Sequence, residues 1–230
     1  MPLLELATSS GLRSLLGMRH ALEPDHLAAV TTLVSRERSG LKAALLGMCW
    51  GLGHTLTLVM VGIVLIVLRA EMPATVSQLF ELGVAFMLVG LGVRAILLAV
   101  REGRNGPARL HRHGRIVHSH AGVTSHLHVG TWTLARRPLI IGMVHGLAGS
   151  GALTALVLAT LPTTAARVTY MALFGLGSTL GMAALSGLLG WPLARLGTHH
   201  VVARGISLLV GCASTALGLV WGYWAFTELI

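Results

Sequence analysis

Long apolar runs alternate with short polar segments along this chain of 230 residues. A helix that crosses a bilayer needs about 20 predominantly apolar residues. Six runs are long enough: residues 11–34, 43–68, 78–100, 138–161, 168–194 and 205–227. This pattern predicts an all-α polytopic membrane protein with six transmembrane helices.

The first apolar run differs from the other five because ionisable residues gather inside it. These residues are Arg19, His20, Glu23, Asp25 and His26. Ionisable side chains within a membrane segment are costly and usually mark the path of an ion or substrate. Pro24 lies among them, and proline has no N–H to donate to the carbonyl of His20. A helix broken at Pro24 can direct His20, Asp25 and His26 to one point, whereas a regular helix would spread them apart.

Two simpler interpretations of this segment compete with a site. The run could be an amphipathic surface helix with solvated charges, or Asp25 could serve only as the ion-pair partner of Arg19. Ionisable groups within a membrane segment disfavour the first interpretation, and the second leaves both histidines unexplained. We therefore predict that His20, Asp25 and His26 bind a metal ion.

His54 is the fourth predicted metal ligand. It lies in the middle of the second apolar run, which carries no charged residue. The alternative is a packing histidine with a satisfied hydrogen bond. Imidazoles combined with a carboxylate suit nickel, cobalt, zinc or copper better than magnesium or calcium.

Short motifs recur between the two halves of the chain. Gly-Met-Arg-His at 17–20 matches Gly-Met-Val-His at 142–145, an offset of 125, and Gly-Leu-Gly-His-Thr-Leu at 51–56 matches Gly-Leu-Gly-Ser-Thr-Leu at 175–180, an offset of 124. Leu-Val-Gly at 88–90 recurs at 209–211, an offset of 121. The alternative is that such glycine motifs only serve helix packing.

The repeat predicts how the chain is organised. Each copy holds three predicted spans, and an odd number of spans inverts the second copy relative to the first, as in many secondary transporters. We predict a first three-helix repeat at 1–100 with the metal motif, a linker at 101–137 and a second three-helix repeat at 138–230. The repeat adds His145 and Ser178, the counterparts of His20 and His54, as possible metal or cavity residues, and Glu23 and Thr55 are further candidates of this kind.

The linker at 101–137 is polar, basic and rich in histidine, which is typical of a loop. Its histidines are His111, His113, His118, His120, His126 and His128. We expect them to gather metal weakly. The alternative is a solvated basic loop that titrates near neutrality.

Basic residues divide unequally between the two sides of the predicted topology. One side carries 12 Lys or Arg: Arg36, Arg38, Lys42, Arg101, Arg104, Arg109, Arg112, Arg115, Arg136, Arg137, Arg195 and Arg204. The other side carries three, Arg13, Arg69 and Arg167. Because cytoplasmic loops are enriched in Lys and Arg, the linker is predicted to be cytoplasmic and both termini outside. The net charge of +9 therefore reflects topology, and no nucleic-acid partner is expected.

The remaining composition excludes several classes of function. Cys49 and Cys212 lie in apolar runs without a CxxC pair, so a disulfide framework, a cysteine zinc site and a thiol–disulfide carrier are not expected. No Gly-x4-Gly-Lys phosphate loop is present, so transport would need no ATP. A signal peptide is not expected either, because the first residues lack a basic start and a small-residue cleavage site.

Residues 19–26, Arg-His-Ala-Leu-Glu-Pro-Asp-His, resemble the histidine-x4-aspartate-histidine signature of the nickel/cobalt transporter family. Together with Trp-Gly-Leu-Gly-His-Thr-Leu-Thr at 50–57, they are similar to its UreH-type branch, the urease accessory proteins. The resemblance implies metal-site roles for His20, Asp25, His26 and His54. It also implies transport of Ni²⁺ or Co²⁺ across the plasma (inner) membrane.

The same resemblance leaves a second function open, which is delivery of metal to a nickel enzyme such as urease without transport. A metal-dependent intramembrane enzyme would need a general base, for which Glu23 is the one candidate, and we do not expect an enzyme. The expected partners are a divalent metal ion and the bilayer, with nickel-enzyme maturation proteins or a second copy of the chain as further candidates. No permanently bound cofactor is expected, since the metal is the cargo.

Overall fold

A computed structural model describes residues 2–35, 37, 39–70, 72–105, 111–113, 116–118, 126–129, 132–147, 161–196 and 200–230. These parts of the chain contain seven α-helices and four short strands. The helices are α1 (Pro2–His20), α2 (Pro24–Val34), α3 (Gly40–Leu68), α4 (Ala74–Asn105), α5 (Arg136–His145), α7 (Thr164–Leu196) and α8 (His200–Thr227). The strands are β1 (His111–His113), β2 (Ile116–His118), β3 (His126–Val129) and β4 (Trp132–Ala135).

Four of the described helices are long and apolar enough to cross a membrane: Gly40–Leu68, Ala74–Arg101, Thr164–Leu196 and Val201–Thr227. They match the second, third, fifth and sixth predicted spans. Their outer faces expose large apolar side chains, including Phe86 at 75% and Leu188 at 73%, as expected for helices surrounded by lipid. The first predicted span is divided between α1 and α2, and the fourth begins with α5 and continues into residues 148–160, outside the described part of the chain.

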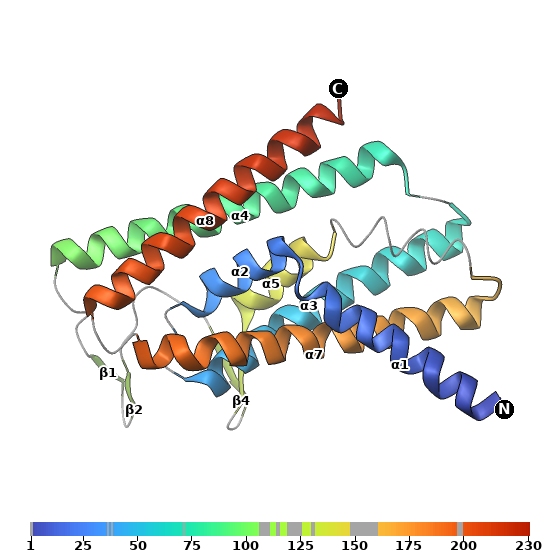
Figure 1. The fold of residues 1–230 in the computed structure, drawn as a ribbon, viewed down its shortest axis with the longest axis horizontal. Helices are drawn as coiled ribbons and strands as arrows, with labels where there is room; N and C mark the ends of the chain where they lie inside the picture. The colour runs from blue at the N-terminus through green and yellow to red at the C-terminus, as the bar shows by residue number, and fades with distance from the viewer. Residues whose placement is uncertain are drawn as a thin grey trace.

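The long helices pack in two pairs, with α3 along α7 and α4 along α8 (Figure 1). Helix α1 packs against α7, and α5 packs against α3. The short helix α2 lies between the two pairs, where it contacts α4, α7 and α8. His20 and Ala21 before the break and Asp25 and His26 after it are buried, whereas Leu22 in the turn is 56% exposed.

Several basic residues counted on one side of the predicted topology lie at one end of the helical body. Helices α4 and α7 end, and α3 and α8 begin, at the same end of the body (Figure 1). Arg101, Arg195 and Arg204 belong to these helix ends. The chain's two termini lie toward the opposite end.

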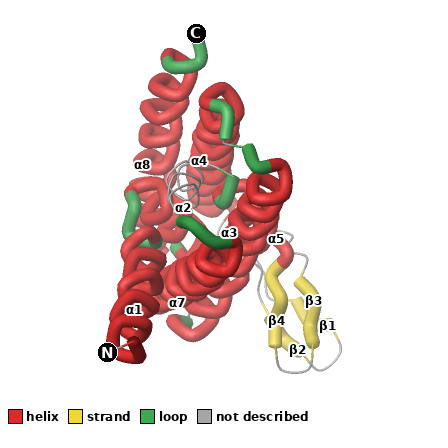
Figure 2. Tube along the Cα trace, turned by 90° about the vertical axis from the view of Figure 1, so that its right-hand side faces the viewer, coloured by secondary structure: helices red, strands yellow, loops and turns green. Residues whose placement is uncertain are grey.

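The linker contains regular structure that its composition did not predict. Strands β1 and β2 form one antiparallel hairpin, in which His111 pairs with His118, and β3 and β4 form another, in which His126 pairs with Ala135. Both hairpins project to one side of the helices (Figure 2). The all-α class thus holds for the helical body, and the linker adds two small hairpins.

Glycines allow the closest contacts between helices, and these contacts occur in reciprocal sets. A Cβ at Gly17 of α1 would overlap the carbonyl oxygen of Phe174 in α7. A Cβ at Gly142 of α5 would overlap the carbonyl oxygen of Trp50 in α3. Gly142 is 125 positions after Gly17, and Phe174 is 124 positions after Trp50. The α1–α7 contact therefore has a counterpart in the α5–α3 contact.

Candidate metal centre

A sharp interruption between α1 and α2 brings the histidines of the first motif together. Helix α1 ends at His20, and α2 begins at Pro24. Proline is favourable at the first position of a helix, because an N–H there would have no partner within the helix. In the turn, the Glu23 N–H donates to the carbonyl of His20 (3.1 Å) and the Leu22 N–H to that of Arg19 (2.9 Å). These tight bonds satisfy the carbonyls that the helix can no longer use. The predicted break at Pro24 is therefore confirmed.

Three histidines from three helices converge at this break. The ring centroid of His20 lies 4.3 Å from that of His26 and 5.2 Å from that of His54, and the His26 and His54 centroids are 5.3 Å apart. One ring nitrogen from each histidine lies within 4.8 Å of those of the other two. All three side chains are buried, and His54 is 0% exposed.

Carboxylates lie at hydrogen-bond distance from Nδ1 of two of these rings and orient them. Glu23 Oε1 lies 2.8 Å from Nδ1 of His20, and Asp25 Oδ1 lies 2.9 Å from Nδ1 of His26. Nε2 of His20, Nε2 of His26 and both ring nitrogens of His54 have no hydrogen-bond partner among the described residues. Metal-binding histidines in proteins typically have such an outer carboxylate, which fixes the ring and leaves the other nitrogen for the ion.

Asp25 also connects this cluster to the second half of the chain. Its Oδ2 lies 2.9 Å from Nε2 of His145 at the end of α5, and its Oδ1 accepts the backbone N–H of His26 at 2.8 Å. The position of Asp25 in the first turn of α2 favours a negative charge there. Asp25, His26 and His145 form a second buried group whose ligand atoms all lie within 4.8 Å of one another.

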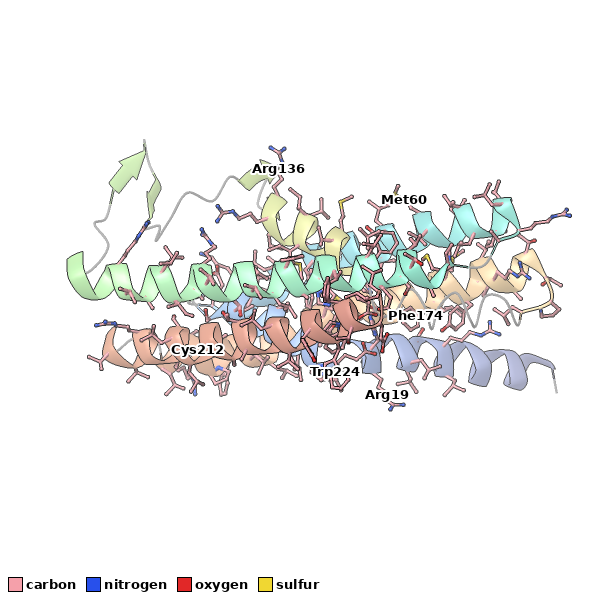
Figure 3. All side chains as sticks on the ribbon, turned by 90° about the horizontal axis from the view of Figure 1, so that it is seen from above. Arg19, Met60, Arg136, Phe174, Cys212 and Trp224 are labelled. Atoms are coloured by element: carbon pink, nitrogen blue, oxygen red, sulfur yellow. The ribbon has the colours of Figure 1, made fainter. Side chains whose placement is uncertain are left out.

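The structure excludes the simple pairing of Asp25 with Arg19. Both carboxylate oxygens of Asp25 lie at hydrogen-bond distance from histidine nitrogens. Arg19 is exposed, and its side chain points away from the helices (Figure 3).

Two aromatic residues of the site were missed by the sequence argument. The ring of Trp50 lies 5.4 Å from that of His26 and 5.5 Å from that of His145, and the ring of Phe174 lies 5.6 Å from that of His20. Trp50 is fully buried, and its Nε1 has no partner in the described structure. The repeat could have pointed to both residues, because Phe174 is the counterpart of Trp50 at the offset of 124 and both directly precede a Gly-Leu-Gly motif.

The other predicted candidates divide between the site and the packing around it. Ser178 is fully buried, and its hydroxyl has no partner within the described ranges. The hydroxyl of Thr55 instead bonds the carbonyl of Gly175 at 2.9 Å, so it contributes to helix packing. Of the linker histidines, His120 lies outside the described residues, and the structure describes the backbone of the other five.

Comparison with known proteins gives a consistent picture. A family model described as NicO, high-affinity nickel-transport protein, matches residues 8–197. A protein named urease accessory protein UreH, from Bacillus sp. (strain TB-90), is 31% identical over 209 residues, which cover 90% of this chain and 87% of the relative. No solved structure gives a significant match.

Proposed function

This chain belongs to the NicO family of high-affinity nickel-transport proteins, and from that premise we propose that it carries Ni²⁺ or Co²⁺ across the plasma (inner) membrane. The ion would bind His20, His26 and His54. Asp25 would hold the ring of His26 in place, and Glu23 would hold that of His20. The metal is cargo, so each ligand must also release it.

The observation that carries this proposal is the set of buried, unpartnered ring nitrogens. Burying a polar group without a hydrogen bond costs about 1–3 kcal/mol. Four such nitrogens on His20, His26 and His54 would be an unexplained cost if the cluster only served packing. A bound cation would satisfy them, and imidazole nitrogen is a preferred donor for nickel and cobalt.

The inverted repeat supplies a route between the two sides of the membrane. Its support is the reciprocal packing of the halves. A Cβ at Gly53 would overlap the carbonyl oxygen of Leu139, and a Cβ at Gly177 would overlap that of Ser14, again at offsets of 124 and 125. A transporter of this kind opens to each side in turn by rocking one half against the other around a central site. We propose six spans, with α1–α2 as the first and residues 138–161 as the fourth.

The proposed orientation places both termini outside and the linker in the cytoplasm. Its support is the imbalance of 12 basic residues against three, because the positive-inside rule sets the orientation of membrane helices. The histidines of the linker would then lie on the side from which a cytoplasmic nickel enzyme receives its metal.

Metal delivery without transport is the second candidate function. The UreH relative is named a urease accessory protein, which favours this function. An accessory protein of this kind would bind the ion at the same histidines and pass it to a maturation partner. The two functions differ in one measurable respect, which is movement of metal across a sealed bilayer.

Purified protein reconstituted into liposomes tests the transport proposal directly. We expect uptake of Ni²⁺ or Co²⁺ into the lumen, at least tenfold above protein-free vesicles, and its loss in His26→Ala. Ser214→Ala is the matched control, because Ser214 is also fully buried but bonds the carbonyl of Leu88 in α4, away from the histidines. Binding without uptake in wild-type protein would favour the delivery function.

A further inference from the structure

We propose a second cation position beside the first, formed by Asp25, His26 and His145, and a single ion that moves between the two by exchange at His26. This inference rests on the proposed transport function. It assigns His145, at the end of α5, as a direct ligand during passage of the ion.

Two overlapping groups of ligand atoms carry the inference. The first group is His20, His26 and His54, and the second is Asp25, His26 and His145. Within each group, all ligand atoms lie within 4.8 Å of one another. The ring centroid of His26 is 4.0 Å from that of His145 and 4.3 Å from that of His20. His26 thus stands between two positions that an ion can occupy with little displacement.

The two positions exclude each other because of the chemistry of imidazole. A neutral imidazole has one N–H and one nitrogen lone pair. When Nδ1 of His26 carries the proton and donates a hydrogen bond to Asp25, only Nε2 can bind a metal ion, and it does so in the first position. In the second position Nδ1 binds the ion. Water bound to the hydrated ion takes the proton from Nδ1 and returns one to Nε2, so the ring keeps its proton count. One ion therefore occupies the site at a time.

His145 makes the complementary change. In the described arrangement, its Nε2 lies 2.9 Å from Asp25 Oδ2 and its Nδ1 has no partner among the described residues. In the second position Nε2 binds the ion and Nδ1 carries the proton. Asp25 then exchanges two accepted hydrogen bonds for direct contact with the cation.

The second position differs from the first in charge and in the helices that form it. The first position has three neutral rings from α1, α2 and α3, with the carboxylate of Asp25 behind them. The second includes that carboxylate as a ligand and adds α5, which belongs to the other half of the chain. Exchange at His26 therefore moves the ion from a site within one half to a site shared by both halves. The ion would then contact both halves, which in alternating access rock against each other around the site.

A purely structural role for His145 would be to donate a hydrogen bond to Asp25. His145→Gln separates the two roles, because the glutamine amide keeps an N–H donor near the position of Nε2 but is a poor ligand for nickel or cobalt. We expect His145→Gln to bind Co²⁺ within about tenfold of the wild-type affinity and to lose at least tenfold in the rate of liposome uptake. Wild-type uptake by this variant would overturn the second position.

X-ray absorption of Co²⁺-loaded protein gives an independent test. His54→Ala removes a ligand of the first position only. We expect this variant to bind one Co²⁺ more weakly, with a carboxylate oxygen in its ligand set, while His145→Gln keeps a set dominated by imidazole nitrogen. A His54→Ala protein that melts normally but binds no Co²⁺ would overturn the proposal, and Ser214→Ala should match wild type in every measurement.

The outcomes also separate this inference from the proposed function. If wild-type protein moves no metal into liposomes, the transport function fails, and the ligand set of His54→Ala still decides whether the second position exists. If wild-type protein transports and His145→Gln transports equally well, only the second position fails.

Discussion

Thr55 of α3 and Thr179 of α7 share a hydrogen bond, with their hydroxyl oxygens 3.0 Å apart, although 124 positions separate them along the chain. The offset is the one that relates the two copies of the Gly-Leu-Gly motif, so each threonine meets its own counterpart. If a two-fold axis relates the two halves, a residue can contact its own counterpart only close to that axis. His54 precedes Thr55 directly, and Ser178 precedes Thr179. The histidine of the candidate site therefore lies next to the contact at which the two halves meet.

The reciprocal glycine contacts predict matched effects on stability. Gly17→Ala and Gly142→Ala should each lower the free energy of unfolding by about 1–3 kcal/mol, because the added methyl group must displace the backbone of the neighbouring helix. Thermal unfolding in detergent would measure both. Gly90→Ala is the matched control, because a Cβ at this position in α4 meets nothing within 4 Å.

Gly90→Ala should leave the melting temperature unchanged or raise it slightly, since alanine favours a helix over glycine by about 1 kcal/mol. Equal melting temperatures for all three variants would show that the close approach of α1 to α7 and of α5 to α3 does not limit stability.

The distribution of basic residues predicts the topology. A reporter inserted between residues 104 and 115 should report the cytoplasm, and one fused after Ile230 should report the outside. The reason is that Lys and Arg near span ends are retained on the cytoplasmic side. Reporter pairs such as alkaline phosphatase and a fluorescent protein respond in opposite ways to the two sides. The same side for both fusions would contradict the six-span arrangement.

The convergence of the first motif was predictable because proline has a fixed local consequence. A missing N–H and a steric clash break the helix at Pro24 whatever surrounds it. That break alone separates His26 from the regular helical path of His20. The partner of Asp25 was not predictable in the same way, because it depends on how α5 packs. The predicted role of Asp25 as a ligand beside His20 and His54 stays a prediction, while the structure directs its oxygens to His26 and His145.

Trp50 and the linker hairpins show the other limits of the sequence argument. A tryptophan in an apolar run looks like any lipid-facing or core residue. The repeat relates Trp50 to Phe174, but the contacts of its ring with His26 and His145 depend on the fold. The pairing of β1 with β2 joins His-Arg-His to Ile-Val-His, and segments of three residues are too short to show the alternation typical of a half-buried strand. Composition therefore predicted a loop at this place.

Deletion of residues 111–128 tests the role of the linker. If its histidines only gather metal, the deletion should raise the concentration needed for half-maximal Ni²⁺ uptake by about threefold to tenfold and leave the maximal rate measurable. The physical reason is that flexible or paired histidines raise the local metal concentration without forming the transport path. Complete loss of uptake in a correctly inserted deletion protein would instead place the linker in the path. Replacement of the same residues by a Gly/Ser segment of equal length controls for the shortened connection.

Asp25→Asn is the sharpest single test of the metal centre, because it keeps the shape of the side chain and removes its charge. The carboxylate accepts from His145 with one oxygen and from His26 with the other. An amide has only one acceptor oxygen, and its NH₂ group would face one of these N–H donors. At least one ring would lose its orientation, and the negative charge beside the cation would disappear. Outer carboxylates of metal sites typically contribute 10-fold to 100-fold in affinity, so Co²⁺ binding measured by calorimetry should weaken by about this factor.

Glu23→Gln is the matched comparison for Asp25→Asn. The amide oxygen at position 23 can still accept a hydrogen bond from His20, and the side chain of Glu23 is 41% exposed, so the loss of affinity should be smaller. Normal metal affinity in a folded Asp25→Asn protein would mean that the cation binds elsewhere.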